Sequence, residues 1–138
     1  MNEIEHVQRE LIADFLSMED AFEQYAYLIE LSAMLPPFAP EKKTKDRLEK
    51  GCQSSVWLDF SIKDGLFYMG ADSDTYIMKG VLYLLMRMLN GQPPDRVAEA
   101  KITLFEETAL MAVFETDRQK GIGSILREIR CFAGGTGA

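Results

Sequence analysis

Apolar side chains recur every three or four residues over the first third of the chain, which is the period of an amphipathic α-helix. The predicted first helix carries on one face Ile4, Val7, Leu11, Ile12, Phe15 and Leu16. Ser17 followed by Asp20 resembles a capping box and predicts the start of a second helix. The Pro36–Pro37 pair ends that helix. Its apolar face is predicted to consist of Phe22, Tyr25, Leu28, Ile29 and Leu35.

The middle of the chain changes to the two-residue alternation of a β-strand. Val56, Leu58, Phe60 and Ile62 alternate with more polar neighbours. The Asp64–Gly65 pair that follows is a strong signal for a two-residue hairpin turn, and residues 66–71 return as a second strand. The pattern therefore predicts a β-hairpin over about residues 55–71.

The second half of the chain is again helical. Asp72, Ser73 and Asp74 are N-cap candidates for the apolar stretch 77–89, and Gly91 follows its end. After Pro93 and Pro94 the pattern predicts a short helix or turn near 97–102, and then a helix over 104–114. Thr116 or Asp117 is predicted to cap a last helix. That helix would carry one apolar stripe of side chains: Ile122, Ile125, Leu126, Ile129 and Phe132.

This order of elements predicts an α+β fold, in which a small antiparallel sheet is packed with helices before and after it. The pattern leaves room for a third strand but does not place it. No internal repeat or low-complexity linker divides the sequence. We therefore expect residues 1–138 to form a single domain, with 134–138 as a loose tail.

The composition and net charge of the chain indicate which kinds of binding partner are unfavourable. The 138 residues are 47% hydrophobic, which suits one core that needs neither a disulfide nor a metal. With 15 basic and 22 acidic residues the net charge is −7, which argues against binding to nucleic-acid phosphates or to an anionic membrane surface. The apolar stretch 77–89 is too short to span a membrane. Since the sequence shows no signal peptide, we expect a cytoplasmic protein.

The chain has two cysteines and one histidine, too few for the common structural zinc sites. We therefore predict no bound metal. A stable disulfide between Cys52 and Cys131 is not expected in a reducing cytosol. Cys131, near Arg127 and Glu128 on the last predicted helix, is interpreted as incidental.

Cys52 stands in an unusual setting for a core cysteine. It follows Gly51, precedes the polar residues 53–55 and lies at the mouth of the first predicted strand. The thiolate is the reactive form of cysteine, and backbone N–H groups of such a loop, with Lys50 nearby, would stabilise it. Gly51 would allow another protein's reactive group to approach closely. The competing interpretation is a cysteine that fills a small gap in the core.

Several motifs of this sequence resemble those of the SufE family, whose members accept sulfur from cysteine desulfurases. The stretch from Gly51 to Trp57 is similar to the family's G-C-Q-S-x-V-W signature, and the stretch 72–80 to its D-S-D-x-x-I-x-K-G. The stretch 25–36 resembles a Y-x-Y-x-I-E-L…L-P helix end, while Arg118 and Gly121 fit an R-x-x-G element. The resemblance covers about residues 22–130 and implies a fold thought to be shared with NifU-type scaffolds.

The resemblance also implies a function. A SufS-type desulfurase, which holds the pyridoxal phosphate and cleaves the C–S bond, leaves a persulfide on its own cysteine. Cys52 would take the outer sulfur and pass it to an Fe–S assembly scaffold of the SufBCD type. The resemblance thus implies that the chain holds no cofactor of its own. It would be a sulfur carrier that stimulates its desulfurase rather than a stand-alone enzyme. We expect a monomer or a weak homodimer.

Other residues are assigned supporting roles. Gly51, Gln53 and Ser54 are predicted to shape the loop around Cys52. Asp74 and Arg118 are predicted to contact the partner or to steady that loop. The simpler alternatives are a helix cap for Asp74 and an ordinary surface residue for Arg118. A helix N-terminus close to Cys52 would favour its thiolate.

Three rival functions stay open at this point. A cluster scaffold of the NifU or IscU kind needs about three cysteine ligands, and this chain has only two cysteines. A thiol redox protein using Cys52 is disfavoured because no Cys-x-x-Cys motif is present. A binding module that activates a desulfurase without carrying sulfur is the third.

Overall fold

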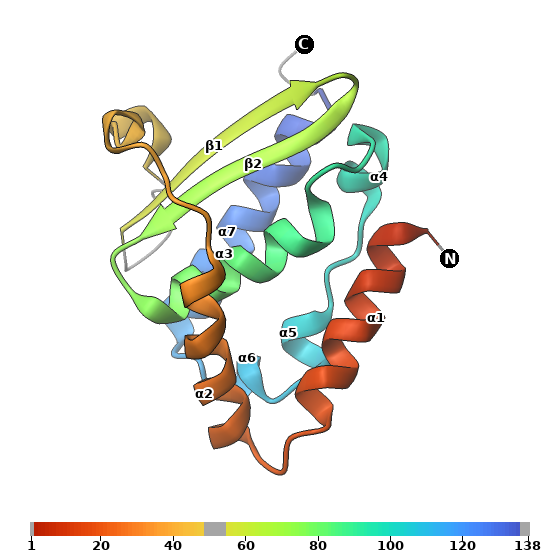
Figure 1. Ribbon diagram of the computed structural model, residues 1–138, viewed down its shortest axis with the longest axis vertical. Helices are drawn as coiled ribbons and strands as arrows, with labels where there is room; N and C mark the ends of the chain where they lie inside the picture. The colour runs from red at the N-terminus through yellow and green to blue at the C-terminus, as the bar shows by residue number, and fades with distance from the viewer. Residues whose placement is uncertain (1, 49–54, 136–138) are drawn as a thin grey trace.

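The computed structural model describes residues 2–48 and 55–135. Its helices are α1 (Glu3–Leu16), α2 (Ala21–Leu31), α3 (Tyr76–Leu89), α4 (Pro94–Glu99), α5 (Leu104–Glu107), α6 (Leu110–Val113) and α7 (Thr116–Ala133). Its strands are β1 (Val56–Lys63) and β2 (Leu66–Ser73), and short 3-10 turns lie at Ser32–Met34, Pro40–Lys42 and Lys45–Arg47. Figure 1 shows the hairpin lying over α3 and α7, which confirms the predicted α+β fold. No helix within the described ranges is long and apolar enough to cross a membrane.

Helices α1 and α2 form where the periodicity predicts them, but the second cap differs from the prediction. Ser17 is the C-cap of α1, and the N-cap of α2 is Asp20, whose Oδ1 accepts a hydrogen bond of 2.8 Å from the Glu23 N–H. The Glu23 carboxylate in turn accepts from the Glu19 N–H at 3.0 Å. The capping arrangement therefore lies three residues later than predicted, because the intervening residues are needed to reverse the chain between the helices.

The buried face of α2 is also rotated from the predicted one. Leu28 is fully buried as expected, but Phe22 is 80% exposed and Ile29 also faces solvent. The buried polar residue on this helix is Gln24, whose Oε1 accepts a hydrogen bond of 2.8 Å from the Ala109 N–H. A buried amide with a backbone partner is stable in the core, so the helix turns Gln24 inward and leaves Phe22 outside.

The predicted hairpin is confirmed and runs to Ser73. Its register pairs Val56 with Ser73 and Lys63 with Leu66. Asp64 and Gly65 form the turn with φ of 53° and 77°, the two positive values that a type I′ turn requires.

The possible third strand is not found among the described residues, where the sheet has two strands. Two isolated β-bridges flank the sheet instead. One joins Leu48 to Trp57, and the other joins Gln92 to Phe67. The Asn90 side chain also pairs with the backbone at the outer edge of β2. Its amide accepts from the Met69 N–H at 2.8 Å and donates to the Met69 carbonyl at 3.1 Å.

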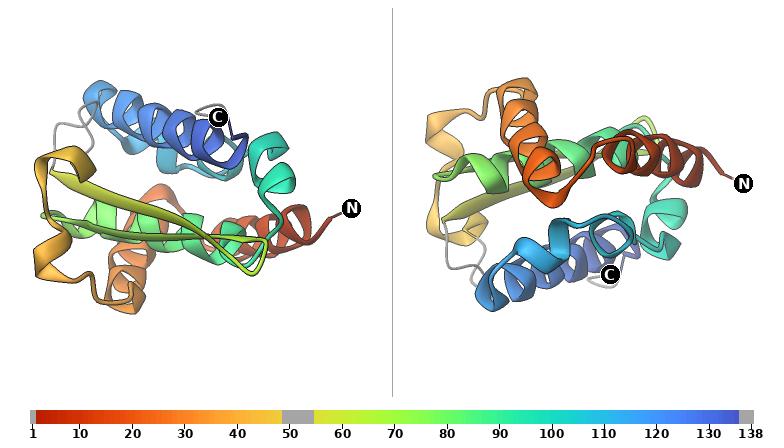
Figure 2. Two further views of the ribbon diagram at one scale, coloured as in Figure 1. Left: turned by 90° about the horizontal axis from the view of Figure 1, so that it is seen from above. Right: turned by 90° about the horizontal axis from the view of Figure 1, so that it is seen from below.

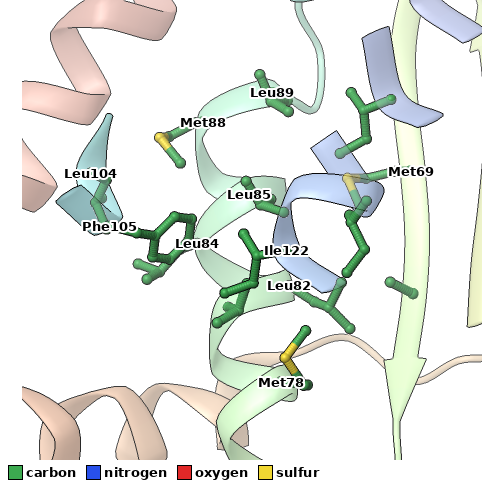
Figure 3. Packing of buried hydrophobic residues seen from close by; sticks show 14 of the residues in the cluster. Met69, Met78, Leu82, Leu84, Leu85, Met88, Leu89, Leu104, Phe105 and Ile122 are labelled. Atoms are coloured by element: carbon green, nitrogen blue, oxygen red, sulfur yellow. The ribbon is translucent and has the colours of Figure 1, made fainter. Parts of the chain in front are cut away.

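Helix α3 is the centre of the core, and it is apolar on nearly every side. It contacts α1, α2 and β2. Figure 3 shows Leu84 facing Phe105 of α5, and Leu82 and Leu85 lying beside Ile122 of α7. Gly91, with φ of 81°, follows the end of the helix as predicted. The N-cap is Thr75 rather than Asp72, Ser73 or Asp74, because β2 continues to Ser73 and delays the start of the helix.

The predicted helix over 104–114 is divided into α5 and α6. Two buried glutamines from the first helices hold the backbone around the division. The Gln8 side chain accepts from the N–H groups of Thr103 and Leu104 at 2.9 and 3.1 Å and donates to the Lys101 carbonyl at 3.0 Å. The Gln24 side chain accepts from the N–H of Ala109, the residue just before α6. Long-range hydrogen bonds thus override a local pattern that favours one continuous helix.

Helix α7 begins at Thr116, after Glu115 as its N-cap, so neither Thr116 nor Asp117 is the cap. Figure 2 shows α7 running alongside the hairpin. Phe132 packs on the inner face of the sheet, with ring centroids 5.3 Å from Phe60 and 6.1 Å from Phe67. The predicted apolar stripe is buried at Ile122, Ile125 and Ile129, whereas Phe132 at its end is 38% exposed.

Gly80 sets how closely α2 and α3 pack. A Cβ atom added at this position would collide with the Leu28 carbonyl oxygen and lie 2.9 Å from two atoms of the Leu28 side chain. We expect Gly80→Ala to destabilise the protein by about 2–3 kcal/mol, because a helix backbone must move to make room. The measurement is the urea midpoint of unfolding.

Gly123→Ala is the matched control, since this glycine also lies inside a helix. Among the described atoms its Cβ would meet only the Arg127 guanidinium, at 3.7 Å. That substitution should stabilise α7 by about 0.5–1 kcal/mol. Equal effects of the two substitutions would contradict a special role for Gly80 in helix packing.

Candidate functional site

The predicted reactive residue Cys52 and its neighbours Gly51, Gln53 and Ser54 lie outside the described residues. The described chain stops at Leu48 and resumes at Ser55. The candidate site therefore consists of the residues that hold these two ends. These are the end of β2, the start of α3 and the basic connector 40–48.

Ser55 is held by the residues that follow β2. Its N–H donates to Asp74 Oδ1 at 3.1 Å, and the Asp74 N–H donates back to the Ser55 carbonyl at 3.2 Å. The Ser73 hydroxyl donates to the same carbonyl at 2.8 Å and accepts from the Thr75 N–H at 3.3 Å. This group of contacts, called the Ser55 clamp below, joins the two predicted motifs in space.

The N-terminus of α3 lies directly beside the Ser55 clamp. Thr75 is the N-cap, and its hydroxyl accepts from the Met78 N–H at 3.3 Å. Asp74, one residue before this cap, is therefore bound to Ser55 rather than to the helix end. A helix N-terminus carries partial positive charge, which favours a thiolate in its neighbourhood.

A second group of contacts centres on Asp72. Its carboxylate lies 2.8 Å from Lys43 Nζ and 4.0 Å from Lys79 Nζ. Partial burial alone would raise the pKa of Asp72, but hydrogen bonds from Lys43 and the Ser73 N–H, with the two lysine charges, hold that pKa below its usual range. The Lys43 ammonium also lies 4.8 Å from the centre of the Trp57 ring. These contacts fix the connector across the outer face of the hairpin.

Asp59 on β1 binds the same connector at a second point. Its carboxylate oxygens lie 3.0 Å from Lys42 Nζ and 3.2 Å from Arg47 Nε. Burial would raise the pKa of Asp59, but hydrogen bonds and charges from these two cations outweigh it and lower the pKa. The sequence pattern did not predict the roles of Asp59, Lys42 and Lys43. The signal available was the run of cations before Cys52 together with acidic residues on the predicted strands.

Arg118 lies in the first turn of α7 and is half-buried. Figure 2 shows this end of α7 at the same end of the molecule as the connector. The adjacent Gln119 donates to the carbonyls of Met111 and Phe114 at 2.9 Å each, which fixes α7 against α6. From its first residue onward, the same helix borders an open groove of about 580 Å³. Its described lining is Thr116, Gln119, Lys120, Gly123, Ser124 and Arg127.

The described residues contain no group of three or more His, Cys, Asp or Glu side chains that could hold a metal ion. Cys131 is exposed near the end of α7. The described part of the candidate site therefore consists of two sets of contacts. Hydrogen bonds hold Ser55 beside the start of α3, and ion pairs hold the connector 40–48 on the hairpin.

Comparisons with known proteins agree on the family. A model of the SufE family, described as an Fe–S metabolism associated domain, matches residues 9–133. An uncharacterised SufE-like protein of Rhizobium etli is 29% identical over 126 residues, covering 88% of this chain and 85% of that protein. In fold, the chain is similar to the solution structure of a hypothetical protein from Thermus thermophilus, with a TM-score of 0.77 at 18% identity over 94% of each chain. The chain therefore belongs to the SufE family, which is associated with Fe–S metabolism.

Proposed function

We propose that the chain accepts sulfur on Cys52 from the persulfide of a SufS-type cysteine desulfurase and delivers it to an Fe–S assembly scaffold of the SufBCD type. The observation that carries this proposal is the family match over residues 9–133, which contains Cys52 in its Gly51–Trp57 motif. The chemistry requires a reducing compartment, so we assign the protein to the cytosol.

The transfer is an exchange between a thiolate and a persulfide. Cys52 thiolate attacks the outer sulfur of the desulfurase persulfide, a new S–S bond forms on Cys52, and the bond to the desulfurase cysteine breaks. The desulfurase cysteine leaves as a thiolate, so electrons balance without an external oxidant or reductant. Pyridoxal phosphate and C–S bond cleavage belong to the desulfurase. The chain thus acts as a carrier that regenerates its partner.

The described structure supports this chemistry in two ways. The Ser55 clamp fixes the chain three residues after Cys52, next to the positive end of α3. The ion pairs of Asp59 and Asp72 fix the connector before it. We propose that these anchors keep Cys52 sheltered at rest and that docking of the desulfurase loosens them.

The first test is intact-mass spectrometry after incubation with a SufS-type desulfurase and cysteine. We expect the protein to gain the mass of one sulfur atom and the Cys52→Ser variant to gain none. Cys131→Ser is the matched control and should gain sulfur like the unmodified chain.

Two results would contradict the relay. Stimulation of the desulfurase by Cys52→Ser without any sulfur gain in either protein would identify a binding activator. A disulfide or sulfenic acid on Cys52 in place of a persulfide would identify a thiol redox protein.

The second test concerns the Ser55 clamp. In a Cys131→Ser background, Asp74→Ala removes the acceptor for the Ser55 N–H. A hydrogen bond of this kind contributes about 1 kcal/mol, so local opening should become about fivefold more frequent. We therefore expect Cys52 to react about fivefold faster with iodoacetamide, as followed by mass spectrometry.

Asp95→Ala serves as the control for the loss of a carboxylate. Asp95 lies on α4 and its carboxylate accepts from the neighbouring Arg96 N–H at 3.0 Å. This variant should leave the alkylation rate of Cys52 unchanged. If Asp74→Ala also left the rate unchanged, the clamp would not be what shelters Cys52.

A further inference from the structure

The outer face of the hairpin carries a hollow of about 370 Å³, which is separate from the Ser55 clamp. Small-molecule sites in proteins usually have volumes of about 300–1,000 Å³, so this hollow has room for a small ligand. Its described lining comes from both strands, from the connector and from the residue that follows α3: Lys42, Asp59, Ser61, Lys63, Tyr68, Met69, Gly70 and Asn90.

The register of the hairpin places most of the polar lining on one face. Ser61 lies opposite Tyr68, and Asp59 lies opposite Gly70. Because side chains alternate between the two faces of a strand, Lys63 shares the outer face with Ser61 and Asp59. Residues directly opposite each other have Cβ atoms about 4.5–5.5 Å apart, so Ser61 and Tyr68 are immediate neighbours.

Gly70 lines the hollow without a conformational or packing reason to be glycine. Its φ is not positive, and the strand pairing runs through it without a bulge. A Cβ atom added there would lie 3.6 Å from the Phe38 ring, which is an ordinary contact, and no described backbone atom would lie within 4 Å of it. Glycine inside a strand weakens it and often marks a place that a ligand or another backbone approaches closely. Since no other backbone does so here, Gly70 favours a ligand.

Three hydrogen-bond donors at the hollow have no partner within residues 2–48 and 55–135. Lys63 forms no ion pair there. The hydroxyl groups of Ser61 and Tyr68 form no hydrogen bond with that part of the chain. An ammonium group and two hydroxyls can therefore bind a ligand in place of water.

The charge of this region is positive, although the whole chain has a net charge of −7. The Asp59 carboxylate is already paired, with Lys42 at 3.0 Å and with Arg47 at 3.2 Å. Together with Lys63, three cations accompany this one carboxylate. The region therefore favours an anion. A zwitterion such as an amino acid fits less well, because its ammonium group would require a carboxylate that is not yet paired.

We propose that this hollow binds a small anion that carries a phosphate group, either phosphate itself or a phosphate monoester. The Lys63 ammonium and the hydroxyls of Ser61 and Tyr68 donate to the phosphate oxygens. Lys42, which remains bound to Asp59, adds a second positive charge. A phosphate group offers three acceptor oxygens to three donors and carries about 1.5–2 negative charges near pH 7, so it fits this set of donors better than a carboxylate does. Lysine binds phosphate as a point charge.

The test is a titration of the unmodified chain with inorganic phosphate at constant ionic strength, followed by the amide signals in ¹H–¹⁵N NMR spectra. The hollow is open and Lys63 is exposed, so we expect weak binding, with a Kd of about 1 mM. The signals of Ser61, Tyr68 and Gly70 should shift and saturate. Acetate is the comparison anion and should bind more weakly than phosphate.

Lys63→Gln removes the charged donor and should weaken phosphate binding at least about tenfold. Lys45→Gln is the matched control for the loss of one positive charge. Lys45 is an exposed residue of the same connector and does not line the hollow. This variant should keep the Kd within about twofold of the unmodified chain, because an exposed charge outside the hollow is largely screened.

Gly70→Val tests the hollow itself, because it fills space beside Asp59 with a β-branched side chain that suits a strand. The phosphate-dependent shifts should be lost while the spectrum stays that of a folded protein. Three results would overturn the proposal: no saturable shift in the unmodified chain, equal weakening by Lys63→Gln and Lys45→Gln, or acetate binding as tight as phosphate binding. The titration involves no sulfur transfer, so its result is independent of the proposed role of Cys52.

Discussion

The burial of helix α3 is the constraint on which the rest of the structure depends. Of its 14 residues nine are buried, so the helix is stable only when other elements cover it on almost every side. Helices α1 and α2 cover one side, and Gly80 allows α2 to approach closely. The hairpin, α5 and α7 cover the others. Each fully buried aliphatic side chain contributes about 1.5–3 kcal/mol, so this helix dominates the stability of the core.

The same helix determines where the candidate site lies, because both of its ends are tied to β2. Its C-terminal end returns to the strand through Asn90 and Gln92. Its N-terminal end follows β2 after two residues, and there Asp74 binds Ser55. Ser55, three residues after Cys52, is thus attached at the start of a helix that is buried over most of its length. A transfer reaction between two proteins benefits from such a support, since a small misplacement of a reacting group slows it strongly.

Polar groups among the described residues mainly hold segments of the chain against one another. Gln8 and Gln24 are buried and fix the backbone around α5 and α6. Asp59 and Asp72 are partly exposed and hold the connector through lysine and arginine side chains. Leaving a buried amide without its hydrogen-bond partner costs free energy, because water cannot replace that partner. The surface ion pairs contribute little to stability and can be released. Releasable contacts suit the proposed loosening of this connector when a desulfurase docks.

Local sequence determined much of this protein. The helical periods predicted α1, α2, α3 and α7, and alternation with Asp64–Gly65 predicted the hairpin, because period and turn chemistry are properties of neighbouring residues. The motif around Cys52 indicated the family that the comparison over residues 9–133 confirmed.

Tertiary structure alone decided what depends on partners distant in sequence. It set the caps at Asp20 and Thr75, the exposure of Phe22 and the division between α5 and α6. It also joined Asp74 to Ser55 and Asp72 to Lys43. A cap, a buried face or an ion pair depends on which competing partner the folded chain brings within reach, and a local pattern carries no information about that distance.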